Sequence, residues 1–345
     1  MSDGATTRKR VIAPAGRQRL GLPPLVRLAA RLPAPLWAAL ALMGITVVLV
    51  ASSGITAFGQ ATVNGLVSGS YLALGAIGLT LVYGVLRLVN FAHGDFLTFG
   101  AYAAYYLNVE QGLPFTVAAL FAVAATALLG VVLELALWRP MRRVGASLFQ
   151  LLLMTIGVAF LIRNGIQFFS TSEMRSFAVD ITSSVRFAGL HVGRMQLVVV
   201  LVGVVLLAMT GVMLKYTWLG KAMRALADNN ELAEVAGIDT GRVVQTTWLL
   251  GAGFAGVAGI LSASSIGVMT PNLGFSQLLG LFAAAVLGGV GNAYGALLGG
   301  ILLGLAQEWS TLFLATQWKT GVGFAILVLT LILLPQGLFG RRRAL

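Results

Sequence analysis

Long runs without Asp, Glu, Lys or Arg dominate the pattern of apolar and polar positions. The run from Leu32 to Leu86 has 55 residues, and the run from Val243 to Gln307 has 65. Four further runs of 19 to 23 residues cover 111–133, 144–162, 195–214 and 320–340. A helix of about 20 apolar residues crosses the hydrocarbon core of a bilayer, whereas the strands of a membrane barrel would alternate apolar and polar residues. The pattern therefore predicts an all-α, polytopic transmembrane helix bundle.

Turn residues divide the two longest runs. Ser52-Ser53-Gly54 separates the first two predicted helices, Thr270 to Gly274 separates two later ones, and Gly288 to Asn292 predicts a tight reversal. We expect about eight to ten spans. The ten predicted positions are 36–52, 62–84, 96–109, 115–138, 147–169, 195–214, 246–268, 276–291, 294–314 and 320–336. The third has only 14 uncharged residues, about 21 Å of helix, so we expect it to be short, tilted or re-entrant.

The basic residues orient these spans. Ten spans place both termini on one side, and assigning that side to the cytoplasm puts 18 of the 23 Lys and Arg residues there, as the positive-inside rule requires. The five outside are Arg163, Arg175, Arg186, Arg194 and Lys319. We expect residues 1–35, which are basic and hold five prolines, to form a flexible cytoplasmic tail before an uncleaved signal anchor. Residues 341–345 are predicted to form a basic cytoplasmic C-terminus.

Composition agrees with a membrane protein and excludes several other classes. Of the 345 residues, 58% are hydrophobic and 10% are charged, against roughly 25% charged in a typical soluble domain. The net charge is +12, and the basic residues that produce it lie between the apolar runs. This distribution indicates membrane topology and not nucleic-acid binding. The chain has no Cys, two His, no Walker A phosphate loop and no H-E-x-x-H motif. We therefore expect no metal, no cofactor and no ATP site in this chain.

A polar segment interrupts the apolar pattern between the second and third predicted spans. It contains Asn90, His93, Gly94 and Asp95. Polar groups near membrane depth are costly and are usually buried, paired or functional. The alternative is a plain helix start, in which Asp95 caps the next helix and Gly94 permits the turn.

The longest polar stretch after the N-terminal tail runs from Lys215 to Thr246. Its apolar positions, which include Leu232 and Ala233, predict two short helices broken at Asp228-Asn229-Asn230. Such helices either lie on the membrane surface or dock into the groove of a partner protein. The residue types alone leave both alternatives open.

Glycines in the C-terminal third mark close contacts between helices. Gly291, Gly295 and Gly299 are spaced four apart, so we expect them to share one helix face. Small residues on a face allow two helix backbones to approach closely. This face is predicted to pack within the bundle or at a dimer surface. A similarity between the Asn90 and Asn292 regions also suggests two related halves.

Isolated charges within the apolar runs are few. We expect Glu134 to pair with Arg139 near the inner surface, and Arg163 to extend its charged end to the outer surface. Glu308 lies near a helix end. A proton-coupled carrier would carry carboxylates or His at the membrane midplane. That class is disfavoured, although Asp95 keeps it open.

Three blocks, in order along the chain, carry a resemblance to a known family. The first block runs from Gly69 to Tyr105 and includes LVNFAHGDF. The second is GKAMRALADNNELAEVAGIDTGRV followed by WLLGAGFAGVAGIL, and the third is LLGLFAAAVLGGVGNAYGALLGGILLGLAQ. Together they resemble the permeases of bacterial ABC importers for branched-chain amino acids, and the smaller of their two permease types. The resemblance covers about residues 58–340, so we interpret 36–340 as a permease domain.

The resemblance implies a division of labour. Importers of this kind use a second permease subunit, two cytoplasmic ATPases and an extracytoplasmic substrate-binding protein, which would explain the absent ATP site. The 215–245 segment would be the cytoplasmic coupling loop. It matches part of the family's E-A-A-x-x-x-G pattern, while the later I-x-L-P part is missing. The coupling residues implied are Gly220, Arg224, Asp228, Glu231, Ala233 and Gly237.

The resemblance also implies a location and a role for the polar segment. The chain would lie in a bacterial inner membrane, and Asn90, His93, Gly94 and Asp95 would shape the pathway or a gate. Similar permeases handle urea or short amides, so that substrate class stays open beside branched-chain amino acids. An ATPase-independent secondary carrier or channel is the second class of function. An intramembrane enzyme is the third, without a recognisable catalytic constellation.

Overall fold

The chain folds into an all-α bundle of membrane-spanning helices, as the hydrophobic pattern predicts. The computed structural model describes residues 46, 48–179, 183–187 and 189–339. Within these residues, six helices are long and apolar enough to cross a membrane. They are α3 (Ile55–Leu86), the continuous helix Phe115–Arg143, α7 (Leu148–Ser170), α8 (Arg194–Tyr216), α11 (Thr240–Ile266) and the helix Thr316–Leu333.

Shorter elements complete the described part of the chain. The helix Phe115–Arg143 consists of α5, the π-helical turn η2 and α6, and Thr316–Leu333 consists of the 3₁₀ turn η3 and α14. An antiparallel hairpin joins α7 to α8. The bounds are α4 (His93–Tyr105), η1 (Tyr106–Glu110), α5 (Phe115–Leu133), η2 (Glu134–Trp138), α6 (Arg139–Arg143), β1 (Ser184–Phe187), β2 (Leu190–Gly193), α9 (Trp218–Asp228), α10 (Asn230–Val235), α12 (Leu273–Gly288), α13 (Ala293–Ser310), η3 (Thr316–Trp318) and α14 (Lys319–Leu333).

Three predicted spans are not among the six membrane-crossing helices of the described part. α4 has 13 residues and continues directly into the five-residue π-helical turn η1. α12 has 16 residues. α13 has 18 residues, as many as Thr316–Leu333, so its composition and not its length separates it from the six. The predicted reversal after Gly288 ends α12, because Gly289 and Gly291 adopt φ of 106° and 85°. The span predicted at 36–52 and the two predicted tails lie almost wholly outside the described residues.

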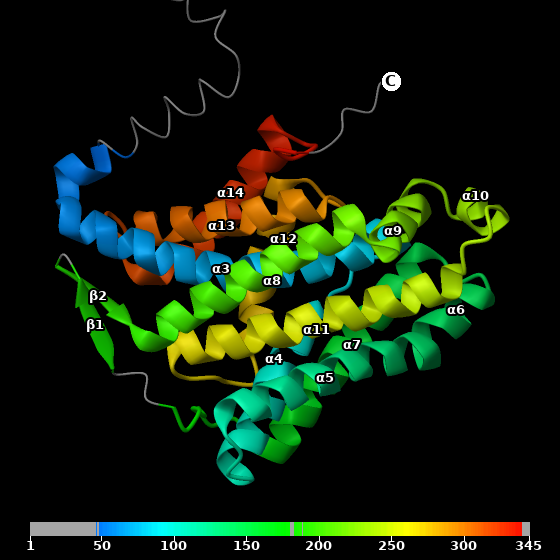
Figure 1. Ribbon diagram of the computed structural model, residues 1–345, viewed down its shortest axis with the longest axis horizontal. Helices are drawn as coiled ribbons and strands as arrows, with labels where there is room; N and C mark the ends of the chain where they lie inside the picture. Colours follow the sequence, from blue (N-terminus) through cyan, green and yellow to red (C-terminus); the bar gives the residue numbers. More distant parts are fainter. Residues whose placement is uncertain (1–45, 47, 180–182, 188, 340–345) are drawn as a thin grey trace, which may run out of the picture. The chain divides into compact units, whose positions relative to one another are not determined.

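The bundle has two distinct ends, which we name after the elements they carry (Figure 1). The hairpin end carries β1 and β2, and the α9 end carries α6, α9 and α10. α3 reaches both ends. Near its start, the Gln60 side chain donates to the His191 carbonyl oxygen at 2.9 Å and accepts from the His191 amide at 3.0 Å. Just after its last residue, Arg87 donates to the carbonyl oxygen of Ala227 in α9 at 2.8 Å.

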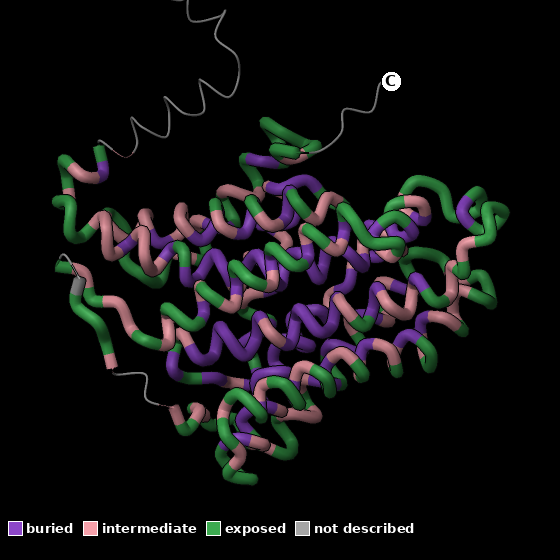
Figure 2. The backbone as a smooth tube through the Cα atoms, viewed as in Figure 1, coloured by how far each residue is buried: buried purple, intermediate pink, exposed green. Residues whose placement is uncertain are grey.

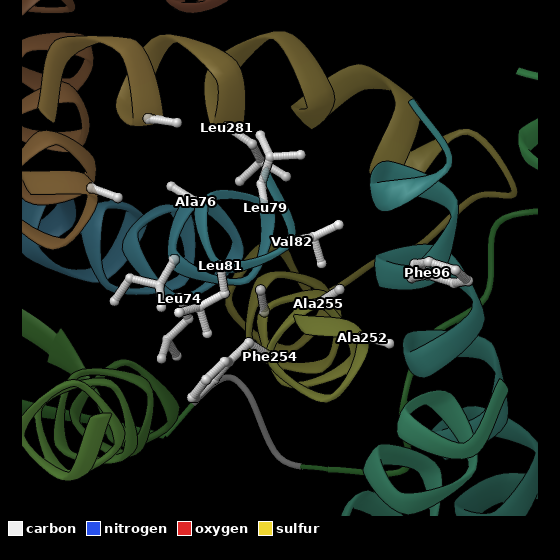
Figure 3. Close-up of a cluster of buried hydrophobic side chains, with 14 of the residues drawn as sticks. Leu74, Ala76, Leu79, Leu81, Val82, Phe96, Ala252, Phe254, Ala255 and Leu281 are labelled. Atoms are coloured by element: carbon white, nitrogen blue, oxygen red, sulfur yellow. The ribbon is translucent and has the colours of Figure 1, made fainter. Parts of the chain in front are cut away.

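Helices α3 and α11 form the centre of the bundle. The most apolar window of α3 is 89% buried and that of α11 is 61% buried, against 22% to 28% for Phe115–Arg143, α7 and α8. Figure 2 shows the buried backbone concentrated along these two central helices. In Figure 3, Leu79 and Val82 of α3 lie in one cluster with Ala255 of α11, Phe96 of α4 and Leu281 of α12. The peripheral helices present apolar side chains outward, which suits a lipid solvent.

Close backbone contacts hold α13 between two neighbours. A Cβ atom at Gly295 or Gly299 would overlap the backbone of α12 near Gly288. On another side of the same helix, a Cβ atom at Gly300 or Gly304 would overlap the backbone of α3. Lipid tails are as apolar as these side chains, so close packing and not water exclusion drives such contacts. Gly295 and Gly299 therefore pack inside the chain itself.

Gly291 departs from the expectation of a shared face. It lies in the turn before α13, with a φ of 85° that L side chains rarely adopt. The helix begins only after Asn292, whose Oδ1 accepts from the amides of Tyr294 and Gly295 at 3.1 and 3.2 Å. The four-residue spacing misled the prediction because the cap at Asn292 starts the helix after Gly291.

Candidate functional site

The chain turns back into the bundle directly after α3. Arg87 ends the helix in the left-handed conformation, with a φ of 54°. Leu88 and Asn90 are only 3% and 1% exposed, so the connection runs through the interior and not over the surface. The Phe91 amide donates to Thr155 Oγ1 of α7 at 3.2 Å. α4 consequently begins inside the bundle.

The start of α4 touches α3 and α12 through His93 and Gly94. His93 Nε2 donates to the carbonyl oxygen of Gly75 in α3 at 2.8 Å. Gly94 lies so close to Gly274 of α12 that a Cβ atom on either would overlap the other's backbone. One turn later, Thr98 Oγ1 accepts from the Gly274 amide at 2.9 Å. Both contacts are buried, so this turn is tied to two helices at once.

Asp95 adds a third helix through a bidentate ion pair. Its carboxylate accepts from Arg163 Nε at 2.9 Å and from Arg163 Nη2 at 3.0 Å. The Asp95 side chain is 0% exposed and the Arg163 side chain 13% exposed. The guanidinium also lies 4.2 Å from the ring centroid of Phe275 in α12. Parallel hydrogen bonds and a flanking aromatic ring make this a strong, directional pair.

Two expectations for these residues are wrong. Asp95 does not cap α4, because Ala92 occupies the N-cap position without a side-chain bond and the carboxylate is engaged by Arg163. Arg163 does not extend to the outer surface. Removing a charge from water costs several kcal/mol unless a partner compensates, and pairing lets both groups stay buried. The two residues are 68 positions apart, so only their rarity within apolar runs could have linked them.

Two polar atoms of the segment have no partner within the described residues. They are Asn90 Nδ2 and His93 Nδ1. Asn90 Oδ1 does accept from the Ala92 amide at 3.0 Å. Buried donors without partners are uncommon and costly. The segment is therefore anchored through its contacts with Gly75, Thr155, Gly274 and Arg163, while these two polar atoms lack partners among the described residues.

The polar loop folds into the two predicted short helices at the α9 end. Thr217 caps α9 by accepting from the Gly220 amide at 3.2 Å, and Asn229 caps α10 by accepting from the Leu232 amide at 3.0 Å. Asn229 thus explains the break that the sequence predicts. The Arg224 guanidinium donates to the Leu214 carbonyl oxygen at the end of α8, and Gly220 packs against the same residue. α9 is fastened to α8 at that point.

The six candidate coupling residues divide into two groups. Gly220 and Ala233 are buried, and Arg224 is exposed but bound to α8. Asp228, Glu231 and Gly237 are exposed, as are two apolar neighbours, Leu232 at 67% and Val235 at 87%. Ala233 is 4% exposed, so the neighbouring apolar residues Leu232 and Ala233 lie on different faces of α10. An exposed surface of α10 that mixes acidic and apolar side chains remains.

A cavity of about 500 Å³ lies beside α9, between α3, η2, α6 and α11. Glu134 and Arg142 line it and form an ion pair, with Nη1 of Arg142 3.1 Å from Oε2 of Glu134. Glu134 was expected to pair with Arg139 instead. The π-helical turn at Glu134–Trp138 is wider than an α-helical turn. Arg142, two turns further on, therefore meets the carboxylate.

A second cavity, of about 450 Å³, lies towards the hairpin end of the bundle. We call it the hairpin-end cavity. Its walls come from α3, α8 and α11 to α14. The lining residues are Asn64, Val67, Ser68, Tyr71, Leu72, Gln196, Ser265, Ile266, Leu273, Ser276, Gln277, Gly280, Gln307, Glu308, Lys319 and Thr320. Among them Lys319 Nζ donates to Glu308 Oε1 at 2.7 Å.

The sequence held a signal for this cavity that the pattern of charges did not reveal. Asn64, Ser68 and Tyr71 are spaced by four and three residues within an apolar run. That spacing puts them on one face of α3. A polar stripe along an otherwise apolar, central helix indicates a face that meets a polar partner or a cavity. From the sequence, Glu308 was noted only as a charge near a helix end, and Lys319 only as one of the five basic residues on the outside.

Comparison with known protein families identifies the family to which most of this chain aligns. Residues 61–331 match the family described as "Branched-chain amino acid transport system / permease component". The chain belongs to this family. The matched range includes the buried start of α4, the short helices α9 and α10, the hairpin-end cavity and the glycine contacts of α13. The resemblance predicted over residues 58–340 is confirmed.

Curated relatives of both permease types are similar to this chain. The high-affinity branched-chain amino acid transport system permease protein LivH of Salmonella typhimurium is 34% identical, with 82% of this chain and 96% of that protein covered. The corresponding protein BraD of Pseudomonas aeruginosa is 32% identical, with 82% and 95% covered. The permease protein LivM of Escherichia coli is 28% identical, with 79% and 68% covered. This member of the family is a multi-pass membrane protein.

Proposed function

We propose that this chain is one of two permease subunits of an ABC importer that carries branched-chain amino acids into a bacterial cell. Membership of the permease family over residues 61–331 carries this proposal. The relatives include two distinct permease proteins, LivH and LivM, whose names describe the same kind of transport system, which supports a second permease as partner. The chain has no Walker A loop, so ATP hydrolysis is assigned to separate ATPase subunits.

The α9 end is proposed to face the cytoplasm and the hairpin end the periplasm. Arg139 and Arg142 belong to α6 and Lys221 to α9. Arg87 follows α3 and bonds to Ala227 of α9, and Arg242 lies in the first turn of α11, shortly after α10. Basic residues concentrate on the cytoplasmic side of membrane proteins. The N- and C-terminal tails are placed in the cytoplasm by the same argument. The binding protein would then deliver its substrate at the hairpin end.

The two short helices at the α9 end are proposed to couple this chain to an ATPase. Glu231, Leu232 and Val235 of α10 are exposed and present acidic and apolar groups to a partner groove. A movement of α10 would be transmitted to α9, which is bonded to α8 through Arg224 and to Arg87 at the end of α3. The exposed residues would make the contact, and Gly220 and Ala233 would keep the two helices packed.

Deleting residues 228–237 tests this coupling role. We expect the ATPase to be lost on purification of the complex, while membrane insertion of the permease persists, because every membrane-crossing helix of the described part remains. Detergent extraction with affinity capture of the permease measures both. Recovery of the ATPase in the normal ratio would contradict the proposal.

The start of α4 is proposed to act as a gate. Asn90, His93, Gly94 and Asp95 lie where α4 meets α3, α7 and α12, so a shift between those helices must pass through them. We expect Asp95→Ala to slow uptake without changing the affinity of the binding protein for its substrate. Unchanged uptake rates in reconstituted vesicles would refute a gating role.

One reconstitution separates the proposed function from its alternatives. Proteoliposomes containing both permeases, the ATPases and ATP are supplied with binding protein and radiolabelled L-leucine. We expect uptake only when every component is present. Uptake without ATPases would indicate a secondary carrier or channel, and uptake of urea or acetamide in place of leucine would indicate the amide-transporting alternative.

A further inference from the structure

The hairpin-end cavity is built from groups that differ sharply in chemistry. Its volume of about 450 Å³ lies within the range of small-molecule sites, which are largely apolar with a few placed polar groups. Glu308 and Lys319 are the only charged residues among those that line it. No residue of the 90–95 segment, α9 or α10 lines it, so this cavity is separate from both of those sites.

The ion pair in this cavity has a single contact, and both side chains are partly exposed. A single hydrogen bond of 2.7 Å joins Lys319 Nζ to Glu308 Oε1. The Glu308 side chain is 11% exposed and the Lys319 side chain 31% exposed. The two residues belong to different helices, α13 and α14, and both line the open space. A ligand can therefore reach each charge without breaking a second bond.

The remaining wall offers one free acceptor and an apolar surface. Gln277 Nε2 donates to Ser262 Oγ, but the buried Gln277 Oε1 has no partner within the described residues. Val67, Leu72 and Leu273 are 2%, 4% and 7% exposed and line the same cavity. An unpaired buried acceptor is costly unless a donor completes it. The cavity thus presents an acidic group, a basic group and an aliphatic wall, and one of its lining residues, Gln277, carries a buried acceptor without a partner among the described residues.

We propose that the hairpin-end cavity binds a zwitterionic, aliphatic α-amino acid by exchanging partners with the Glu308–Lys319 pair. The α-ammonium group of the ligand takes Glu308 and the free oxygen of Gln277, and its α-carboxylate takes Lys319. The aliphatic side chain packs against Val67, Leu72 and Leu273. Charges removed from water are stable only when paired, and this exchange leaves every charge paired before and after binding. The proposal rests on the proposed function and names a substrate site within it.

The charge pattern selects against other small molecules. Urea and short amides carry no net charges, so they cannot replace either partner of the ion pair. An amine without a carboxylate would take Glu308 and leave Lys319 unpaired. A site built around polar groups discriminates strongly against ligands that leave those groups unpaired. The cavity therefore matches an amino acid and mismatches an amide.

Transport by the complete importer in proteoliposomes is the first test. We expect Lys319→Gln and Glu308→Gln to lower leucine uptake at subsaturating substrate roughly tenfold or more, the effect of one lost charge-assisted hydrogen bond. The matched control is Glu173→Gln, which makes the same change in an ion pair with Arg175 whose carboxylate is 74% exposed outside the cavity. The control variant should transport at the wild-type rate.

Thiol protection is the second test, and it does not depend on transport. The chain has no Cys, and the partner subunits used in the experiment carry no reactive thiol. Thr320→Cys therefore gives this subunit a single thiol, at the cavity wall. We expect L-leucine to slow its labelling by a small, water-soluble thiol reagent. The same ligand should protect poorly when Lys319→Gln is added, and urea should protect in neither background.

The outcomes separate the inference from the proposed function. A wild-type importer that takes up no leucine would overturn the proposed function itself. Leucine uptake without protection of Thr320→Cys, or with normal rates in both charge variants, would overturn the amino-acid site and leave the permease function standing. Protection by urea but not by leucine would also overturn it.

Discussion

Two ion pairs within the bundle have opposite designs. Asp95 and Arg163 share two hydrogen bonds, the carboxylate is fully buried, and an aromatic ring covers the guanidinium. Glu308 and Lys319 share one hydrogen bond at the wall of a cavity, and both side chains keep some exposure. The first pair joins α4 to α7 in the interior, whereas the second joins two consecutive helices beside open space.

This difference in design indicates a difference in role. A fully buried, bidentate pair leaves an uncompensated charge if either partner is removed, so it acts as a tie between helices. A pair with a single bond at a cavity can exchange its partner for a ligand or for water. We infer that the same two chemical groups, a carboxylate and a cation, serve structure in one place and binding in the other. Asp239 and Arg242, at the surface of the α9 end, provide a third, exposed pair for comparison.

The largest expected effect is on the buried pair. Arg163→Ala leaves the Asp95 carboxylate buried without a partner, and we expect the free energy of unfolding to fall by about 3–5 kcal/mol. Thermal unfolding of the purified permease in detergent measures this. Arg163→Lys should recover part of the loss, because an ammonium replaces the charge but not the two parallel bonds. A melting temperature equal to that of the wild type would show that the pair is not a structural tie.

Removing both members of that pair sharpens the same point. Asp95→Ala combined with Arg163→Ala leaves no buried charge, so we expect the double variant to be more stable than Arg163→Ala alone. A double-mutant cycle on unfolding free energies gives the coupling between the two residues. Additive losses would contradict the tie, since independent residues do not couple. Uptake by the double variant should stay slow, because α4 loses its bond to α7.

The cavity pair is expected to behave in the opposite way. Lys319→Gln should change the free energy of unfolding by about 1 kcal/mol or less, because a partly exposed pair contributes little to stability. Its effect should instead appear in leucine uptake. Parallel measurement of melting temperature and uptake distinguishes the two. A large loss of stability would show that the Glu308–Lys319 pair also joins helices structurally, and would contradict the proposed difference between the two pairs.

The smallest effect is expected at the surface. The Arg242 and Asp239 side chains are 84% and 53% exposed, so Arg242→Gln should alter the free energy of unfolding by about 1 kcal/mol or less, and still less at high salt. Urea or thermal unfolding at two ionic strengths checks this. A loss as large as that of Arg163→Ala would mean that burial does not set the ranking of the three pairs.

Local features of the fold followed from the residues themselves. Gly54, Gly289 and Gly291 adopt positive φ at the breaks that the sequence predicts, and Asn229 caps α10 at the predicted division between the two short helices. The hairpin of β1 and β2 was not predicted, because strands of four residues are too short to show a pattern. The successes have one cause: turns, caps and long apolar runs are determined by residues close together in the chain.

Partners distant in the chain did not follow. A helix cap was one of two alternatives for Asp95, and Arg163 was expected at the surface, yet they bind each other across 68 positions. Glu134 was assigned to Arg139, and a π-helical turn gave it Arg142 instead. Gly291 was assigned to a helix face that begins after it. In each case the observed arrangement depended on helix packing, or on where a helix begins or changes its winding, and residue spacing does not reveal either.

The sequence by itself determined that this protein lies in a membrane, which segments form its helices, where most of them break, and to which family it belongs. These properties depend on the solvent around each helix and on backbone geometry over a few residues. The tertiary structure alone decided which charges are paired and which polar faces enclose the hairpin-end cavity. Pairing depends on which helices lie side by side, and close contacts at residues such as Gly94, Gly274, Gly300 and Gly304 decide that arrangement together.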